Sequence, residues 1–381
     1  MSSKNMGAVS IVAGTSIGAG MLGLPMAIGS LGFITGTLVL IFMWIVAIYA
    51  ALLLLEINLD FGKGVNLNFM THAILGRAGQ IIGTGSICFL FYCLLVAYLT
   101  GMGGLISSAT GLEPHIGSLL FAVVSALLLY VGTNAVVAAN KYLFIAMIVG
   151  MAISFATLGG QLDASNLVLG EPSPKMLLLA LPVLFTSFGY HPCLPSIVNY
   201  IGDDKKTLVR ILFLGSTIPF ICYLVWLLLS LGSATPSELG GMANVDVLIG
   251  TMSGGSSWVS TVLSAFASLA LITSFIGVSL GLFDLIAETF RRENDKKGRA
   301  GTSLIVFVPP LIASMLAPDS FIAALAHAGA AFTVSAILIP CIMAWKMRNA
   351  GRNTTFRAFG GRPAIVACFI CGLVIITASY L

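Results

Sequence analysis

Long apolar runs recur along the whole chain, separated by short polar segments. We count eleven runs, most of them long enough for an α-helix to cross the hydrocarbon core of a bilayer, which takes about 20 residues. They lie at 7–29, 33–57, 80–107, 116–134, 142–160, 176–200, 208–232, 256–288, 302–317, 320–345 and 363–381. Barrel strands would instead alternate between apolar and polar positions over about ten residues. The pattern therefore predicts an all-α membrane protein with about 11 transmembrane helices.

The composition agrees with this prediction. Hydrophobic residues make up 58% of the chain and charged residues only 8%, whereas a soluble domain is about 25% charged. The first apolar run is too long for a signal peptide and has no clean cleavage site, so we expect a retained first span.

The distribution of positive charges predicts the orientation. With the N-terminus in the cytoplasm, every lysine and arginine except Lys175, that is 17 of the 18, falls on the cytoplasmic side. This obeys the positive-inside rule. We expect a multi-pass protein of the cytoplasmic (inner) membrane, with the C-terminus on the periplasmic, outer side.

Glycine and proline interrupt the first apolar run. The stretch GTSIGAGMLGLP, residues 14–25, holds four glycines and a proline in twelve positions, and each of them weakens a helix interior. Close packing of small residues against a neighbouring helix is one explanation. The combination with Thr, Ser and Pro favours the other, a discontinuous helix.

The same pattern returns in the sixth run. Thr15-Ser16-Ile17-Gly18 is followed by Pro25, and 171 residues later Thr186-Ser187-Phe188-Gly189 is followed by Pro195. The long connections 58–79 and 233–255 each follow the second run of a half. Five spans per half place the halves in opposite orientations. We therefore predict an inverted repeat, with spans 1–5 in residues 1–160, spans 6–10 in 161–345, and a loop and span 11 in 346–381, the two long connections acting as gates.

Two facing breaks suggest a binding site. In inverted-repeat transporters the first helix of each half is discontinuous near the midplane, and the substrate binds there. Freed amides and carbonyls at the half-helix ends suit a zwitterion. We expect amides near Gly18 to Gly20 to meet a carboxylate, and carbonyls near Gly14 and Phe185 to meet an ammonium group. The residues expected at the breaks are Gly14, Thr15, Ser16, Ile17, Gly18, Ala19, Gly20, Phe185, Thr186, Ser187, Phe188, Gly189, Tyr190 and His191.

Three motifs together carry a resemblance to a known family. The stretches IVAGTSIGAGMLGLP, FTSFGYHPCLPS and LITSFIGVSLGLFDLIAETF resemble the hydroxy and aromatic amino acid permeases, and the tyrosine-specific and tryptophan permeases most of all. The resemblance runs from end to end. It implies a LeuT-type 5+5 inverted-repeat fold with discontinuous helices 1 and 6 and one extra C-terminal helix. It also implies proton-driven uptake of an aromatic amino acid, with tyrosine favoured and tryptophan or phenylalanine as alternatives.

An aromatic substrate calls for a ring-lined apolar pocket. Beside Phe185 and Phe188, we expect Tyr92 and Phe275 to contribute to it, whereas Tyr98 is better explained by helix packing.

The coupling ion has several candidate sites. His191 is an ionisable residue near the centre of a span, so it handles a proton or the substrate, or it orients the break as a structural residue. Thr273 and Ser274 match the hydroxyl pair that holds sodium in sodium-coupled relatives of this fold. Glu56 and Asp284 lie towards the cytoplasmic ends of their spans. Charge pairing at the interface is the favoured explanation for Glu56, whereas Asp284 lies deeper and is a candidate gate or relay residue.

Other classes of function fit less well. A sodium-coupled aromatic symporter and a serine or threonine permease of the same family remain open as alternatives. A channel is one such class, and in a transport assay it would show neither saturation nor counterflow. A membrane enzyme needs clustered catalytic groups, and only His191 is central. We expect no cofactor, no metal, no nucleic acid and no obligate protein partner. The partners expected are the amino acid, the co-transported proton and membrane lipid.

Overall fold

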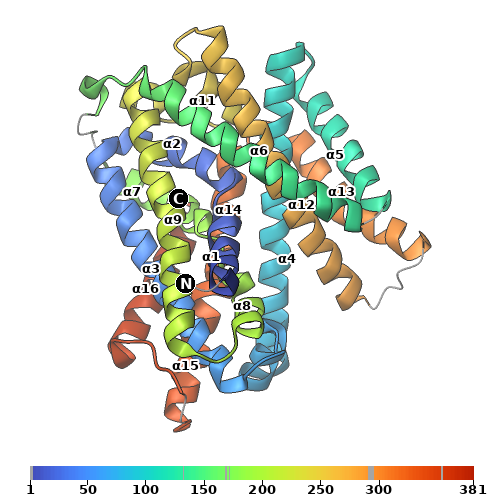
Figure 1. The fold of residues 1–381 in the computed structure, drawn as a ribbon, viewed down its shortest axis with the longest axis vertical. Coiled ribbons are helices and arrows are strands. Elements are labelled where there is room, and N and C mark those ends of the chain that lie inside the picture. Colours follow the sequence, from blue (N-terminus) through green and yellow to red (C-terminus); the bar gives the residue numbers. More distant parts are fainter. Residues whose placement is uncertain (1–2, 132, 168–169, 171, 291–295, 353–354) are drawn as a thin grey trace.

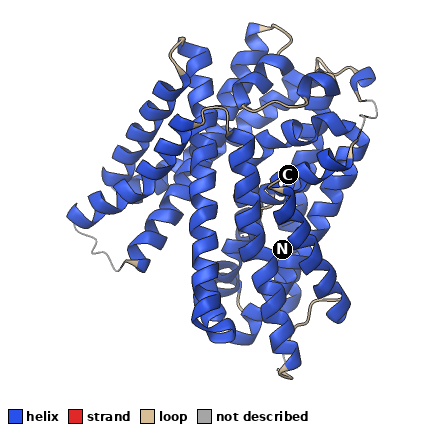
Figure 2. Cartoon of the chain, turned by 180° about the vertical axis from the view of Figure 1, so that it is seen from behind, coloured by secondary structure: helices blue, strands red, loops and turns tan. Residues whose placement is uncertain are grey.

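The chain folds into a bundle of helices, described here from a computed structural model (Figures 1 and 2). The structure describes residues 3–131, 133–167, 170, 172–290, 296–352 and 355–381. Within these residues there is no strand, and nine helical segments are long and apolar enough to cross a membrane. The all-α prediction is therefore confirmed for the described residues, and the number of eleven spans stays a prediction. Residue 132, inside the expected span 116–134, lies outside the described residues.

The first apolar run is broken where its glycines predict. Helix α1 (Ser3–Ser16) ends before Ile17 and Gly18, and a 3-10 turn, η1 (Ala19–Leu22), leads into α2 (Gly23–Ile28) and η2 (Gly29–Leu31). Gly18 has extended backbone, with φ 179° and ψ −152°, which an α-helix excludes. The end of α1 and the start of η1 thus leave helix termini inside the bundle.

The sixth apolar run is broken in the same way. Helix α7 (Pro174–Ser187) ends before Phe188–Tyr190, and η4 (His191–Cys193) leads into α8 (Leu194–Ile201). Pro192 and Pro195 occupy first-turn positions of η4 and α8. Proline is tolerated there because its missing N–H would have no partner in the helix.

The remaining helices complete the bundle. They are α3 (Gly32–Phe61), α4 (Leu67–Thr110), α5 (Pro114–Val131), α6 (Thr133–Gly159), η3 (Ala164–Asn166), α9 (Lys205–Ser233), α10 (Pro236–Leu239), α11 (Val245–Met252), α12 (Ser257–Thr289), α13 (Lys296–Leu316), α14 (Phe321–Thr333), the π-helical η5 (Val334–Leu338), α15 (Ile339–Asn349) and α16 (Gly361–Ala378).

The two long connections are more ordered than the sequence suggests. Most of 58–79 is helical: α3 continues to Phe61, and α4 begins at Leu67 and bends at Gly76, where φ is 74°. The connection 233–255 contains α10 and α11. Thr235 and Glu238 form a capping box at the start of α10, which satisfies its first amides.

Helix packing follows a paired order. Helix α1 packs on α9 while α7 and α8 pack on α3; α4 packs on α14 while α12 packs on α6. Helices α5 and α13 contact each other and lie at one edge of the molecule (Figure 1). The two broken segments meet through α2 and α7 inside the bundle.

Candidate functional site

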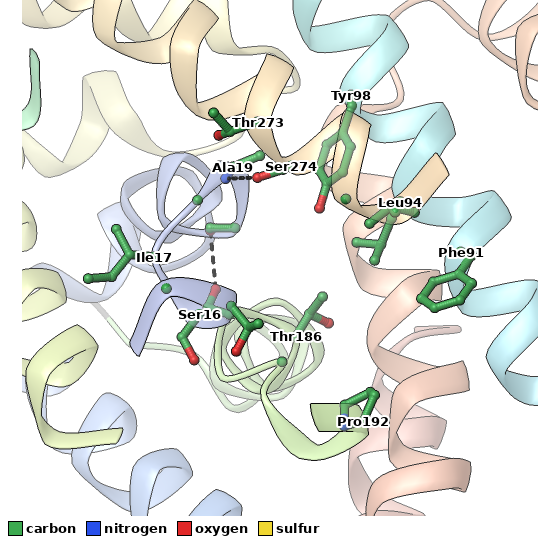
Figure 3. A pocket seen from close by; sticks show the side chains of 18 of the residues that line it. Ser16, Ile17, Ala19, Phe91, Leu94, Tyr98, Thr186, Pro192, Thr273 and Ser274 are labelled. Atoms are coloured by element: carbon green, nitrogen blue, oxygen red, sulfur yellow. Dashed lines mark hydrogen bonds between the residues drawn. The ribbon is translucent and has the colours of Figure 1, made fainter. Parts of the chain in front are cut away.

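A cavity of about 350 Å³ lies where the two breaks meet. The first break, α4, α6, the second break and α12 all contribute to its wall (Figure 3). The lining residues are Gly14, Thr15, Ser16, Ile17, Gly18, Ala19, Gly20, Leu90, Phe91, Leu94, Tyr98, Asn140, Phe144, Thr186, Ser187, Gly189, Pro192, Cys193, Thr273, Ser274, Gly277, Val278 and Phe332.

Two hydrogen bonds hold the first break in place. The backbone amide of Ala19 donates to Ser274 Oγ on α12 at 3.0 Å (Figure 3). The Ser187 hydroxyl shares its one proton between the carbonyl oxygens of Gly20 at 3.1 Å and Val183 at 3.0 Å. The bond to Gly20 joins the end of α7 directly to η1. The breaks are therefore linked to each other and to α12, so movement of one is coupled to the others.

Tyr223 of α9 binds both helix ends. Its hydroxyl lies 2.6 Å from the carbonyl oxygen of Ser16, the last residue of α1, and 2.6 Å from that of Ser187, the last residue of α7. Terminal carbonyls lack partners within their own helices. Because the hydroxyl has one proton, it serves one of the two carbonyls at a time.

The glycines of the first break permit close approach. A Cβ atom on Gly18 would lie 2.5 Å from Ser274 Oγ, and one on Gly20 would lie 3.3 Å from Ser187 Cα. A larger side chain at either position would separate the contacts that join the breaks. Here the glycines serve contact between segments rather than unusual dihedral angles.

The structure brings ten of the sixteen residues expected to bind substrate into the wall of this cavity. They are the seven residues from Gly14 to Gly20, together with Thr186, Ser187 and Gly189. The other six do not line it: Phe185, Phe188, Tyr190, His191, Tyr92 and Phe275.

Those six side chains pack elsewhere. Phe185 stacks on Phe332 with ring centroids 4.9 Å apart, and Phe188 packs edge-on against Tyr223. Phe275 contacts Phe121 and Phe307, and the Tyr92 hydroxyl donates to the carbonyl oxygen of Ile305 at 2.8 Å. A role for them in this arrangement is indirect, through the shape of the wall.

His191 is enclosed by aromatic rings. It is 2% exposed, stacks on Tyr190, and lies near Phe185 and Phe332. Its Nε2 donates to the carbonyl oxygen of Ala47 on α3 at 3.0 Å. This contact ties η4 to the second span, which is the arrangement expected of a residue that orients the break.

The hydroxyl pair of α12 faces the first break. Thr273 Oγ1 donates within its own helix, to the carbonyl oxygens of Leu269 at 2.9 Å and Ala270 at 3.2 Å. Ser274 Oγ accepts from Ala19. Both residues line the cavity beside the first break.

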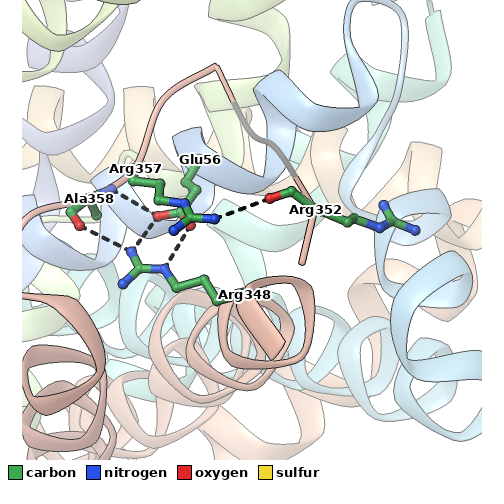
Figure 4. A network of polar contacts seen from close by, with 5 residues as sticks. All are labelled: Glu56, Arg348, Arg352, Arg357 and Ala358. Atoms are coloured by element: carbon green, nitrogen blue, oxygen red, sulfur yellow. Dashed lines mark hydrogen bonds and ion pairs between the residues drawn. The ribbon is translucent and has the colours of Figure 1, made fainter. Parts of the chain in front are cut away.

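The two carboxylates proposed for coupling have different surroundings. Glu56 is fully buried and accepts from Arg348 Nε at 2.9 Å, Arg348 Nη2 at 2.6 Å and the Ala358 amide at 2.8 Å (Figure 4). Asp284 is exposed on α12, outside the cavity lining. Glu56 thus links α3 to α15 and to the segment before α16 through hydrogen bonds. Among the described residues, no group of three or more His, Cys, Asp or Glu side chains could hold a metal ion.

Sequence reasoning missed the far wall of the cavity. Leu90, Phe91, Leu94 and Tyr98 of α4 line the cavity, with Tyr98 and Leu94 nearest to the first break in Figure 3, and Asn140 and Phe144 lie on α6. The spacing of the α4 residues is helical. That helix is apolar on every side, however, so its sequence does not mark the face that meets the cavity.

Comparison with known proteins places this geometry in a family. The chain matches the model of the tryptophan/tyrosine permease family over residues 1–379. It is 34% identical to the tryptophan-specific transport protein of Pseudomonas aeruginosa, over 97% of this chain and 92% of that protein. It is 30% identical to tyrosine-specific transport system 1 of Haemophilus influenzae, over 99% and 96%.

A third relative has a different name. The chain is 31% identical to glutamine transporter 2 of Aliivibrio fischeri, over the full length of both proteins. All three are transport proteins rather than enzymes. The broken first and sixth apolar runs and the full-length matches agree: the chain is a multi-pass membrane protein that belongs to the tryptophan/tyrosine permease family.

Proposed function

We propose that the protein takes up an aromatic amino acid by proton symport, with tyrosine as the favoured substrate and tryptophan or phenylalanine as alternatives. The observation that carries the proposal is the cavity at the two breaks. One part of it is backbone and hydroxyl groups, and another is apolar and aromatic side chains. This division matches a substrate with a zwitterionic head and a ring. The family, with relatives named for tryptophan and tyrosine transport, supports the same substrate class.

The polar part suits the amino acid head. At the start of η1 the amides of Gly18 and Gly20 meet the carboxylate, because a helix N-terminus is partially positive. The Ala19 amide already donates to Ser274 Oγ. Carbonyl oxygens at the ends of α1 and α7 receive the ammonium group. The carbonyl of Phe185, which the sequence also suggested for the ammonium group, accepts from the Phe188 amide at 3.1 Å and lies outside the cavity lining.

The apolar part suits the ring. Leu90, Phe91 and Leu94 of α4 line the cavity, and the Phe144 ring of α6 lies against Gly14, 3.2 Å from the position of a Cβ there. Ring stacking and burial on such side chains favour an aromatic substrate over serine or threonine. The alternative is a serine or threonine permease of the same family, whose small substrate would leave the apolar part of the cavity unfilled.

We further propose eleven spans in a LeuT-type 5+5 inverted repeat, with repeats at 1–160 and 161–345 and span 11 in 346–381. The paired packing supports this. In such a repeat, span 3 (α4) corresponds to span 8 (α12), and span 5 (α6) to span 10 (α14). The contact of α4 with α14 then has its counterpart in that of α12 with α6, and the contact of α4 with α5 in that of α12 with α13.

The cavity supports a direction of opening. Asn140 and Phe144 are near the start of α6, Gly277 and Val278 follow the hydroxyl pair of α12, and Cys193 precedes α8. With the N-terminus in the cytoplasm of an inner-membrane protein, all of these lie on the cytoplasmic side of the breaks. The arrangement then corresponds to the inward-facing state of alternating access.

Proton coupling rests on the family resemblance. Ser274 Oγ accepts from the Ala19 amide and keeps a second lone pair. Sodium coupling at Thr273 and Ser274 is the alternative. His191, Glu56 and Asp284 remain the candidate proton carriers.

The test is substrate competition on purified protein. Bound labelled tyrosine should be displaced by tryptophan and phenylalanine, and not by serine or glutamine. Gly18→Leu, which drives a side chain into Ser274, should abolish binding while membrane insertion is kept. Gly85→Leu on α4 is the matched control, because no atom lies within 4 Å of a Cβ there and the residue lies outside the cavity lining. Displacement by serine alone would reject the aromatic site, and normal binding by Gly18→Leu would reject its location.

A further inference from the structure

A second cavity opens on the flank of the bundle, between α3 and α9. It has a volume of about 420 Å³ and shares no residue with the cavity at the breaks. Its lining is Trp44, Ile45, Ile48 and Leu52 of α3, Val209, Leu212 and Phe213 of α9, and Phe356, Arg357 and Phe359 of the segment before α16. We refer to these ten residues as the flank groove.

The walls of the flank groove face the membrane. Ile45 is 52% exposed and Phe213 is 49% exposed, although both are large apolar residues on spanning helices. Trp44 closes the end furthest from Arg357: its ring stacks on Phe220 at 4.7 Å and contacts Phe213 at 5.7 Å. From Trp44 to Leu52 the helix rises about 12 Å. This depth accommodates part of a lipid acyl chain.

The opposite end of the groove is cationic. Arg357 lines the groove and is exposed. Lys205 Nζ donates to the carbonyl oxygen of Thr355 at 3.0 Å, which brings the first turn of α9 beside this segment. Arg210 is exposed and follows Val209, a groove residue. The charges of Arg357 and Lys205 therefore lie beside the same short segment where the apolar walls end, and Arg210 lies in the adjoining part of α9.

The neighbouring carboxylates are already engaged. Asp204 caps α9 by accepting from the Thr207 hydroxyl at 2.6 Å. The other three are paired with cations: Glu56 with Arg348, Asp60 with Arg352, and Asp203 with Lys63. Arg357 Nη2 donates to the carbonyl oxygen of Arg352 at 3.3 Å, and no carboxylate within the described ranges forms an ion pair with Arg357. Its charge is available to an external anion (Figure 4).

We propose that the flank groove binds an anionic glycerophospholipid. One acyl chain lies along Ile48 and Leu212, and the headgroup phosphate is bound by Arg357 with Lys205 and Arg210 nearby. A guanidinium group donates to phosphate oxygens in a bidentate manner. Basic pockets between spanning helices are a common place for anionic headgroups. The bound lipid would join the second span to the seventh, next to the contact of Glu56 with Arg348.

Trp44 offers a direct readout of this proposal. The chain has four tryptophans, so a variant with Trp226, Trp258 and Trp345 changed to Phe reports on the groove alone. Purified protein in detergent is titrated with phosphatidylglycerol or phosphatidylcholine that carries brominated acyl chains, and quenching of Trp44 fluorescence is followed. We expect phosphatidylglycerol to bind about fivefold more tightly than phosphatidylcholine. Arg357→Ala should remove the difference, and Arg357→Lys should keep most of it.

Two controls separate the groove from the general lipid shell. Arg77→Ala removes an exposed arginine of α4 that does not line the groove, and should leave the preference intact. A variant that keeps only Trp258, which is 67% exposed at the start of α12, should show equal quenching by both lipids. Equal affinity of the two lipids at Trp44, or an unchanged preference in Arg357→Ala, would overturn the proposal.

Trp226 is buried, and its replacement can weaken the fold. A second measurement therefore uses protein that keeps all four tryptophans. Wild-type protein and Arg357→Ala are purified from the same membranes, and retained phosphatidylglycerol per protein is measured. The wild type should retain severalfold more. Equal retention would contradict the proposed site.

Discussion

The hydroxyl group of Tyr223 lies 2.6 Å from the carbonyl oxygen of Ser16, where α1 ends. The same hydroxyl lies 2.6 Å from the carbonyl oxygen at the end of α7. Tyr223 belongs to α9, a helix that is itself unbroken. One donor on a continuous helix thus serves the last carbonyls of both discontinuous ones, and it can change partner without leaving its place.

Removal of this hydroxyl should impair transport more than folding. In Tyr223→Phe both terminal carbonyls lose their donor, and a buried acceptor without a partner costs about 1–3 kcal/mol. We expect the uptake rate to fall about tenfold or more. Tyr49→Phe is the control, because in the described structure the buried Tyr49 hydroxyl has no hydrogen-bond partner. Equal uptake by both variants would show that the contact has no part in transport.

A methyl group at Gly18 should uncouple the first break from α12. The added Cβ would lie 2.5 Å from Ser274 Oγ and displace it from the Ala19 amide. We expect Gly18→Ala to weaken substrate binding about tenfold or more, an effect of about 1.4 kcal/mol. The effect of Gly18→Ala should be smaller in a Ser274→Ala background, since the clashing oxygen is absent. Additive effects of the two substitutions would contradict a direct contact. Gly85→Ala, whose added Cβ meets no atom within 4 Å and lies outside the cavity lining, is the neutral comparison.

Asn140 should distinguish rings that carry a hydrogen-bonding group. Its Oδ1 is buried without a hydrogen-bond partner in the described structure, and the residue lines the cavity. A site that bonds a substrate O–H or N–H discriminates against an analogue that lacks it. We expect Asn140→Leu to weaken binding of tyrosine and tryptophan about fivefold and to leave phenylalanine unchanged. Competition binding of the three amino acids measures this, and a parallel loss for phenylalanine would argue against it.

The contact of Glu56 with Arg348 should be essential for stability. Glu56 has no exposed surface and the Arg348 side chain is 8% exposed. Glu56→Gln leaves the arginine buried without its counter-charge, which costs about 3–5 kcal/mol. The thermal unfolding midpoint of the detergent-purified protein should fall markedly. Asp60→Asn removes the carboxylate of the more exposed pair with Arg352, and should lower the free energy of unfolding by about 1 kcal/mol or less. A normal midpoint with lost proton dependence of uptake would instead favour Glu56 as a proton carrier.

Local sequence signals predicted the breaks well. Gly18 and Gly20 stand where α1 gives way to η1, and Gly189 stands between α7 and η4. Glycine and proline act on their own stretch of backbone, so a single segment contains the information. The placement of the helices along the chain could be predicted for the same reason.

Side-chain direction at the breaks could not be predicted in the same way. Phe185 and Phe188 flank the second break but pack on Phe332 and Tyr223, away from the cavity. Tyr98, explained from sequence as packing, lines the cavity. Membrane helices are apolar on all sides, so periodicity does not say which face meets a cavity. The partner of Glu56 lies 292 residues away, beyond any local pattern.

The central claim is proton-driven uptake of an aromatic amino acid through the cavity at the breaks. The most direct measurement is accumulation of labelled tyrosine in liposomes that contain the purified protein, with an acid-outside pH gradient compared with an inward sodium gradient. We predict accumulation driven by the pH gradient alone, blocked by tryptophan and absent in Gly18→Leu. Accumulation that requires sodium would move the coupling site to Thr273 and Ser274. Transport of serine without transport of tyrosine would contradict the account.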